Sequence, residues 1–165
     1  FYNALIKTLE ITVLILFLVA ASNFFGAVFS RLGTPMLLTE FLLSWDISVT
    51  WVLLIIMALI FLLGWPLEWV PIVLIIVPIL IPVLIKLDVN LVWFGILVAV
   101  NLQTAWLSPP VALSAYFLKG VVPEWDLKDI YLGMMQFMVI QVIGLVLIFV
   151  FPQIALWLPT LIYGE

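Results

Sequence analysis

The stretch Asn101-Leu102-Gln103-Thr104-Ala105-Trp106-Leu107-Ser108-Pro109-Pro110 lies within a long apolar run, Leu91 to Leu118, that would otherwise form a regular membrane-spanning helix. Pro109 and Pro110 have no backbone N–H, and their rings clash with the preceding helical turn. Ser108 is biased toward extended geometry by the proline that follows it. We therefore expect the helix to break at Ser108.

A helix break at the depth of the membrane is costly. In hydrocarbon, each backbone carbonyl or amide that loses its partner costs several kcal/mol. Such a break is tolerated mainly where it lines a cavity enclosed by protein or filled with water, and its two helix ends are natural sites for ions. A proline kink that only shapes helix packing stays open as an alternative, because proline is common in membrane helices.

The composition is that of a membrane protein. Of the 165 residues, 68% are hydrophobic and 8% are charged, and the mean hydropathy is +1.45. A soluble domain of this length does not need so much apolar surface. The sequence has no cysteine and no histidine, which excludes disulfides and removes the commonest metal ligand and general base. The net charge of −4 argues against a nucleic-acid partner.

Turn signals divide the first part of the chain. A membrane span is expected over residues 5–30, ended by the helix-stopping Gly33. Thr34-Pro35 then matches an N-cap followed by a proline at the first helical position. The apolar segment that follows is too short to span, so we expect an interfacial helix over residues 34–45.

Two apolar arms, 47–63 and 70–85, flank the turn Gly64-Trp65-Pro66-Leu67-Glu68-Trp69. They form either two full spans or one re-entrant hairpin over residues 47–86, and hydropathy does not decide between these. Three prolines weaken the second arm as a regular lipid-facing span. Glu68 would be costly in the membrane without a partner and unremarkable in water.

The rest of the chain is expected to hold the broken span, residues 90–118, and a last span, residues 127–149. Asp126 is a suitable N-cap for the last span. Gln136 and Gln141 lie within this span, and we expect both to hydrogen-bond to neighbouring helices. Two prolines near the C-terminus are expected to fragment the tail.

Three stretches together resemble the C-terminal half of the large membrane (permease) subunit of TRAP transporters, the tripartite ATP-independent periplasmic family. They are Ala4-Leu5-Ile6-Lys7-Thr8 with Ala20-Ala21-Ser22, Gly64-Trp65-Pro66-Leu67-Glu68-Trp69 with Ile76-Val77-Pro78-Ile79-Leu80-Ile81-Pro82, and Phe94-Gly95 with Asn101 and Leu107-Ser108-Pro109-Pro110-Val111-Ala112. Glu68 and Ser108 replace the family's usual Asp and Thr and keep carboxylate and hydroxyl chemistry. Ala112 replaces a Gly and removes backbone freedom from the loop.

The resemblance implies an all-α polytopic membrane protein in which residues 1–165 form a single transmembrane region. This region would be one inverted repeat of an elevator-type ion-transporter fold, with a re-entrant helical hairpin and a broken transmembrane helix. The resemblance therefore favours the hairpin over residues 47–86, with its tip at 64–68 facing the break at 105–110. The first repeat would belong to the same large subunit. Phe1 is not an initiator methionine, so a fragment and a processed product are both open.

The resemblance also implies a sodium site between the hairpin tip and the broken helix. Sodium is a hard cation that prefers oxygen, and helix ends and unwound carbonyls supply it. The family's residues for this half carry over to Gly64, Ala105, Ser108 and Val111. Three of these would offer only backbone carbonyls, and Ser108 could add its hydroxyl. No organic cofactor and no other metal is expected.

Other residues around the broken helix are expected to lie near the substrate. They are Asn101, Pro109 and Pro110. Substrate identity does not follow from the sequence, because specificity would depend on both repeats and on the binding protein.

The implied function is part of a sodium-coupled secondary transporter, a symporter that imports a small organic anion such as a carboxylate. A periplasmic binding protein would deliver the substrate, and a small membrane subunit would support the large one. The alternative is a structural or assembly subunit of a membrane complex without a transport site. No nucleophile–base pair, metal cluster or cofactor motif is visible, so an enzyme is not expected.

The expected location is the lipid bilayer of the bacterial or archaeal cytoplasmic (inner) membrane, crossed several times. If residues 47–86 form a hairpin, Lys7, Lys119 and Lys128 share one side, and Arg31 and Lys86 share the other. The positive-inside rule then weakly favours a cytoplasmic position for Lys119.

Overall fold

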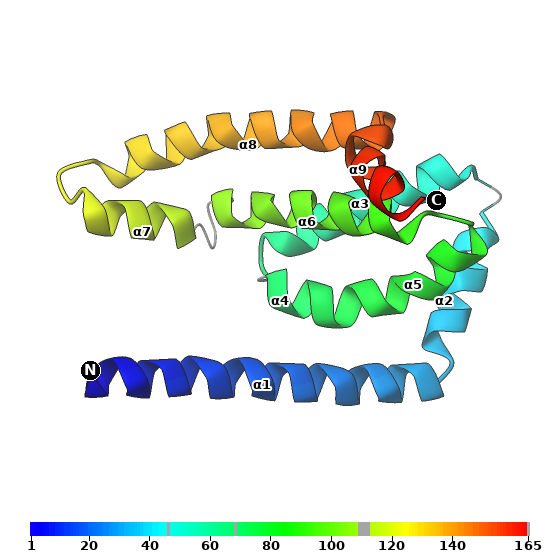
Figure 1. Cartoon of the computed structure of the whole chain (residues 1–165), viewed down its shortest axis with the longest axis horizontal. Coiled ribbons are helices and arrows are strands. Elements are labelled where there is room, and N and C mark those ends of the chain that lie inside the picture. Colours follow the sequence, from blue (N-terminus) through cyan, green and yellow to red (C-terminus); the bar gives the residue numbers. More distant parts are fainter. Residues whose placement is uncertain (46, 68, 109–112, 165) are drawn as a thin grey trace. The chain divides into compact units, whose positions relative to one another are not determined.

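The computed structural model describes residues 1–45, 47–67, 69–108 and 113–164, and all of their side chains except those of Ile11, Leu43 and Leu113. This part of the chain is built of helices and short turns, without a strand (Figure 1). The helices are α1 (Tyr2–Arg31), α2 (Thr34–Leu43), α3 (Val49–Gly64), α4 (Trp69–Pro71), the π-helical segment η1 (Ile72–Ile76), α5 (Val77–Lys86), α6 (Leu91–Leu107), α7 (Leu113–Val121), α8 (Leu127–Val150) and α9 (Gln153–Tyr163).

Three helical segments of the described chain are long and apolar enough to cross a membrane. They are α1, the continuous segment Trp69–Lys86 and α8, with 30, 18 and 24 residues and mean hydropathies of 2.3, 2.5 and 2.3. The helices α3, α6 and α9 are apolar but shorter. The expectation of an all-α polytopic membrane protein is therefore confirmed.

The chain divides into two compact units. The first comprises Phe1–Asp46 and Val70–Lys86, and in it α2 packs against both α1 and α5. Gly33 joins α1 to α2 with a φ of +73°, a left-handed conformation that glycine adopts without strain. The expected N-cap at Thr34 is wrong, because Gly33 takes the N-cap position and Thr34 begins the helix. The buried Thr39 hydroxyl donates a hydrogen bond to the Pro35 carbonyl at 2.6 Å.

The second arm of the 47–86 segment accommodates its prolines by widening its helix. Val77 N–H donates to the Ile72 carbonyl, five residues earlier, which is the π-helical pattern. Pro78 follows directly and has no N–H to continue the ordinary ladder. Pro82 lies inside α5 without ending it. The prolines therefore deform this arm but do not interrupt it.

The second unit comprises Ile47–Trp69 and Leu87–Glu165. Here α6 is central, because it packs against α3, α7, α8 and α9 (Figure 1). Trp93 of α6 donates from its indole N–H to the Ile148 carbonyl of α8 at 2.9 Å. Gln141 of α8 donates to the Val100 carbonyl at 3.1 Å and to the Gln103 side-chain oxygen at 2.6 Å. The interhelical role expected of Gln141 is confirmed, whereas Gln136 is exposed.

The long helix of residues 90–118 is broken as the sequence predicts. The helix α6 ends at Leu107, and Ser108 is extended, with φ −77° and ψ 135°. The helix α7 begins at Leu113 and packs on α8 through a small core of Ala115, Ile130 and Met134. The first helix thus ends at Leu107, and the extended Ser108 separates it from the two prolines.

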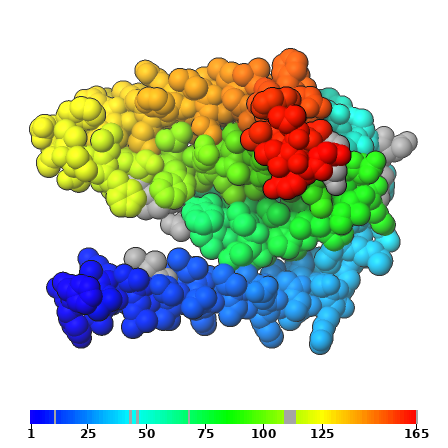
Figure 2. Space-filling view, viewed as in Figure 1, coloured from blue at the N-terminus to red at the C-terminus, as the bar shows by residue number. Residues whose placement is uncertain are grey.

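The C-terminal part of this unit folds back on itself. Asp126 caps α8 by accepting from the Lys128 N–H at 3.0 Å, as expected. The helix α8 ends at Val150, and α9 folds over its end beside α6, as Figure 2 shows in red against orange and green. The expectation that both Pro152 and Pro159 fragment the tail is wrong in part. Pro152 precedes α9, but the helix continues through Pro159.

Candidate cation site at the ends of two helices

The helices α3 and α6 run in the same direction and meet at their C-terminal ends. Near their beginnings, Leu53 of α3 and Trp93 of α6 line one cavity. Near their ends, a Cβ atom built on Gly64 would lie 3.3 Å from the Cβ of Ala105. That distance is tighter than nine in ten real Cβ contacts, so a side chain at Gly64 would require Ala105 to shift by a few tenths of an ångström. The φ of Gly64 is not in the left-handed region, so backbone freedom does not require glycine here.

The last turn of α6 lacks backbone donors. The carbonyls of Ala105 and Trp106 would normally accept from the amides four residues later, but Pro109 and Pro110 have none. The Ser108 hydroxyl donates to the Ala105 carbonyl at 2.8 Å, and Ser108 is fully buried. Because a carbonyl oxygen and a hydroxyl oxygen each have two lone pairs, both atoms can still face a cation.

The last turn of α3 brings a second set of carbonyls. The Leu62 and Leu63 carbonyls accept from the Trp65 and Leu67 amides at 3.4 and 3.0 Å. Gly64 is the last residue of this helix and is buried. The C-terminal ends of α3 and α6 each carry the partial negative charge of a helix end. Two such ends side by side favour a positive ion between or beside them.

Asn101 lies one helical turn before Ala105 on the same face of α6. It is 1% exposed, and its amide nitrogen donates to the Met57 carbonyl of α3 at 2.8 Å. Only the NH₂ group of the amide can donate, so this bond fixes its orientation. The side-chain oxygen is buried and has no hydrogen-bond partner in the described part of the chain.

Trp65, directly after Gly64, has a buried indole N–H that also has no hydrogen-bond partner in the structure as described. Its ring packs edge-on against Phe61, with the ring centroids 5.7 Å apart. Sequence reasoning treated Trp65 only as part of the turn. No pattern in the sequence marks it out, because an unpaired indole is recognised only from its surroundings.

The structure therefore brings together three of the four residues expected at the cation site, Gly64, Ala105 and Ser108. Asn101, expected near the substrate, lies on the adjoining helical turn. Three expected residues lie outside the described part of the chain: Val111, Pro109 and Pro110.

The donor set fits a monovalent cation better than a transition metal. The described residues contain no group of three or more His, Cys, Asp or Glu side chains that could hold a metal ion. The oxygens near Ala105 are neutral carbonyls and hydroxyls. Such ligands suit hard cations, and uncharged ones bind them weakly enough for exchange.

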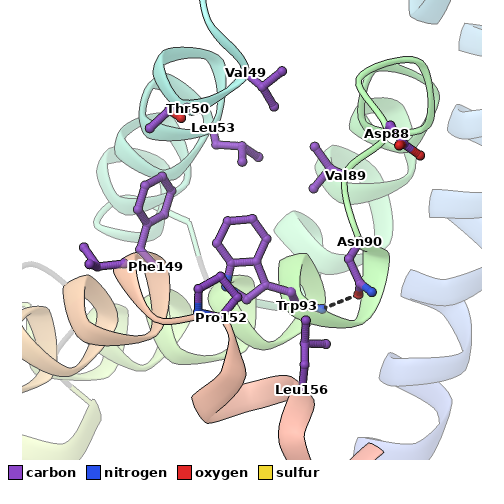
Figure 3. Close-up of a pocket in the computed structure, with 11 residues that line it drawn as sticks. Val49, Thr50, Leu53, Asp88, Val89, Asn90, Trp93, Phe149, Pro152 and Leu156 are labelled. Atoms are coloured by element: carbon purple, nitrogen blue, oxygen red, sulfur yellow. Dashed lines mark hydrogen bonds between the residues drawn. The ribbon is translucent and has the colours of Figure 1, made fainter. Parts of the chain in front are cut away.

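A separate cavity of about 570 Å³ lies at the opposite end of α3 and α6 (Figure 3). It is mostly apolar, and the Trp93 ring in it packs against Phe149 with the centroids 5.6 Å apart. Thr50, Asp88 and Asn90 are its polar lining, and Asn90 caps α6 by accepting from the Val92 and Trp93 amides. The 16 residues of α3 place this cavity about 20 Å from the Gly64–Ala105 contact. It is therefore no part of the candidate cation site.

Comparisons with known proteins show which family the chain resembles over most of its length. Residues 1–154 match the family model described as "Tripartite ATP-independent periplasmic transporter, DctM component". The chain is 30% identical over 166 residues to the sialic acid TRAP transporter large permease protein SiaM of Vibrio cholerae, covering 99% of this chain and 38% of that protein. It is 28% identical over 160 residues to the C4-dicarboxylate TRAP transporter large permease protein DctM of Rhodobacter capsulatus, covering 97% and 36%. It is 27% identical over 161 residues to the sialic acid TRAP transporter permease protein SiaT of Haemophilus influenzae, covering 98% and 26%.

Proposed function

We propose a function that starts from the family of this chain. The chain belongs to the DctM component family of the tripartite ATP-independent periplasmic transporters, whose model covers residues 1–154. Its relatives are transporter permeases and not enzymes. The chain spans 26% to 38% of the length of these relatives, so a complete transporter needs more than this segment. The segment forms one half of the transport core of a sodium-coupled importer of small organic anions.

One observation carries the proposal of sodium coupling. The C-terminal ends of α3 and α6 meet at Gly64 and Ala105, and the Ser108 hydroxyl lies on the Ala105 carbonyl. A sodium ion would be held by the carbonyls of Gly64 and Ala105 and by the Ser108 oxygen, with Val111 completing the set. Helix C-termini and unwound carbonyls are the usual sodium ligands in transporters with broken helices.

The length of α3, the first arm of the 47–86 segment, supports a re-entrant hairpin, although the second arm, Trp69–Lys86, is long enough to cross a membrane. The 16 residues of α3 extend about 24 Å, less than the roughly 30 Å of a bilayer's hydrocarbon core. An arm of this length that enters from one side would end within the hydrocarbon core and short of the opposite surface. The break after Leu107 would then lie at a similar depth, since its helix has 17 residues and runs alongside.

The substrate class rests on the relatives and on the site. The relatives' names specify sialic acid and C4-dicarboxylates, which are all organic acids. A small carboxylate would bind in the neighbourhood of Asn101 and the prolines 109 and 110, held there by the charge of the cation, because the free oxygen of Asn101 cannot donate to it. The buried Trp65 indole N–H, which lacks a partner in the described chain, suits a carboxylate oxygen.

Family membership supports the proposed partners, and the mechanism is part of the same proposal. A periplasmic binding protein would deliver the substrate, a small membrane subunit would support this one, and the first repeat of the large subunit would complete the core. Transport would proceed by an elevator movement in the bacterial or archaeal cytoplasmic membrane. A structural role without transport is less well supported, because the named relatives are permeases.

Uptake by the complete reconstituted transporter tests the proposal. The full large subunit, the small subunit and the binding protein are placed in proteoliposomes with a radiolabelled organic acid. An inward sodium gradient should drive accumulation, and an equal gradient of choline should not. Accumulation that is the same in both salts would overturn sodium coupling.

A further inference from the structure

A row of buried oxygens extends from the candidate cation site into the α3–α6 contact. Asn101, Thr104 and Ser108 lie on one side of α6, and none is more than 1% exposed. All three are polar side chains in a helix that is otherwise almost entirely apolar. A buried polar side chain is costly unless its hydrogen-bonding groups are satisfied, so three in one row call for an explanation.

The donors of these three side chains already have acceptors: each donates to a backbone carbonyl, and the Asn101 amide also donates to the Met57 Sδ at 3.8 Å. Asn101 donates to the Met57 carbonyl at 2.8 Å, Thr104 to the Asn101 carbonyl at 2.6 Å and Ser108 to the Ala105 carbonyl at 2.8 Å. Since each hydroxyl has one hydrogen, Thr104 and Ser108 can offer only lone pairs to any further partner. The face of α6 that contains them is therefore lined by acceptors.

One of these acceptors, the side-chain oxygen of Asn101, has no hydrogen-bond donor in the described part of the chain. This oxygen is buried. The Met57 bond prevents the amide from turning to exchange its oxygen for its nitrogen. Leaving a buried acceptor unpaired is unfavourable, so a donor or a cation is expected beside it.

The site at Gly64 does not account for this oxygen. Asn101 bonds to Met57, which precedes Gly64 by seven residues, or about 10 Å along α3. On α6, Asn101 precedes Ala105 by four residues, or about 6 Å. An ion held by Gly64, Ala105 and Ser108 therefore leaves the Asn101 oxygen to another partner.

We propose that Asn101 and Thr104 form a second position for a monovalent cation, one helical turn before the site at Gly64, Ala105 and Ser108. The inference rests on the proposed sodium coupling. Neutral oxygens alone hold an ion weakly, so this position serves as a transient step for an ion moving along α6. The C-terminal dipoles of α3 and α6 favour a cation at both positions.

Three substitutions in the full large subunit test the second position. Thr104→Val and Asn101→Leu remove an oxygen at nearly constant volume, and Ser108→Ala removes the hydroxyl of the first site. Thr39→Val is the matched control, because Thr39 is 1% exposed and its hydroxyl donates to a backbone carbonyl in α2. Each variant is assembled with its partner subunits.

Two readouts use sodium chloride titrated against choline chloride at constant ionic strength. One is the sodium concentration that gives half-maximal uptake, and the other is the sodium-induced rise in Tm of the purified complex without substrate. We expect Thr104→Val and Asn101→Leu to raise the half-maximal concentration about fivefold or more, as for the loss of one oxygen ligand, and to reduce the Tm rise. Thr39→Val should change neither.

The outcomes separate the two proposals. If only Ser108→Ala alters the sodium response, the first site stands. The second position, at Asn101 and Thr104, is then wrong, and a water molecule satisfies the Asn101 oxygen. If none of the three alters the sodium response, both proposals fail. If Thr39→Val acts as strongly as Thr104→Val, the effect is a general loss of a buried hydroxyl and the second position is again wrong. Should Asn101→Leu not fold, Thr104→Val decides alone.

Discussion

Gly64 and Ala105 lie in close contact at the ends of α3 and α6. A Cβ atom added to Gly64 would lie only 3.3 Å from the Cβ of Ala105. The contact joins residues 41 positions apart in the sequence, counted from 64 to 105. At the end of α6, the Ser108 hydroxyl donates to the carbonyl of the same Ala105 at 2.8 Å. The geometry of the proposed cation site therefore depends on the size of two small residues.

Larger side chains at position 64 should reduce transport progressively. Gly64→Ala should weaken sodium-driven uptake, and Gly64→Val should remove nearly all of it, because a branched side chain cannot fit against Ala105. Uptake is compared at equal amounts of protein in the membrane. The double variant Gly64→Ala with Ala105→Gly should recover most of the activity lost in Gly64→Ala. Normal uptake by Gly64→Val would show that the close approach is not needed.

Ser108→Ala should weaken the response to sodium more than the amount of folded protein. The substitution removes one oxygen and leaves both prolines, and so the break, in place. The loss of a hydrogen-bonding oxygen from a charged partner is worth about 1–2 kcal/mol. The half-maximal sodium concentration should therefore rise about five- to thirtyfold. Ser108→Thr, which restores the hydroxyl, should respond like the natural protein; an unchanged value for Ser108→Ala would exclude the hydroxyl as a ligand.

A cysteine at Trp65 should report the depth of the hairpin tip. The chain has no natural cysteine, so Trp65→Cys introduces a unique thiol into it. If residues 47–86 form a hairpin, this thiol should react slowly with a bulky, membrane-impermeant maleimide from the cytoplasmic side, and sodium or substrate should change the rate. Rapid cytoplasmic labelling that ignores both ligands would instead indicate two ordinary spans. A cysteine at the exposed Glu124, in the turn between α7 and α8, is the labelling control.

Gln141→Leu should destabilise the contact between α6 and α8. It removes the two hydrogen bonds to Val100 and Gln103, at a cost of about 0.5–2 kcal/mol for such bonds between membrane helices. The Tm of the purified protein in detergent should fall. Gln136→Leu is the matched control, because Gln136 is exposed on the same helix and should leave the Tm nearly unchanged. Equal effects of the two substitutions would show that the bonds of Gln141 contribute nothing.

The sequence by itself predicted the helices and several of their ends, because these depend on interactions between residues close together in the chain. Ser108-Pro109-Pro110 ends α6 because proline has no N–H, and Asp126 begins α8 because its carboxylate accepts a free backbone amide. Hydropathy alone predicted the membrane class, which does not depend on how the helices meet. The same local rules failed at Thr34 and Pro159, where neighbouring turns and tertiary packing override weak preferences.

Only the tertiary structure decided which of these residues meet. The family resemblance marked Gly64 and Asn101 as site residues, but their contacts with Ala105 and Met57, each about 40 residues away, come only from the tertiary structure. The unpaired Asn101 oxygen and Trp65 N–H are equally invisible in the sequence, because an unsatisfied group is defined by what surrounds it. Sequence patterns report interactions within a turn or two of helix, whereas a binding site is formed by contacts between helices that the chain brings together only on folding.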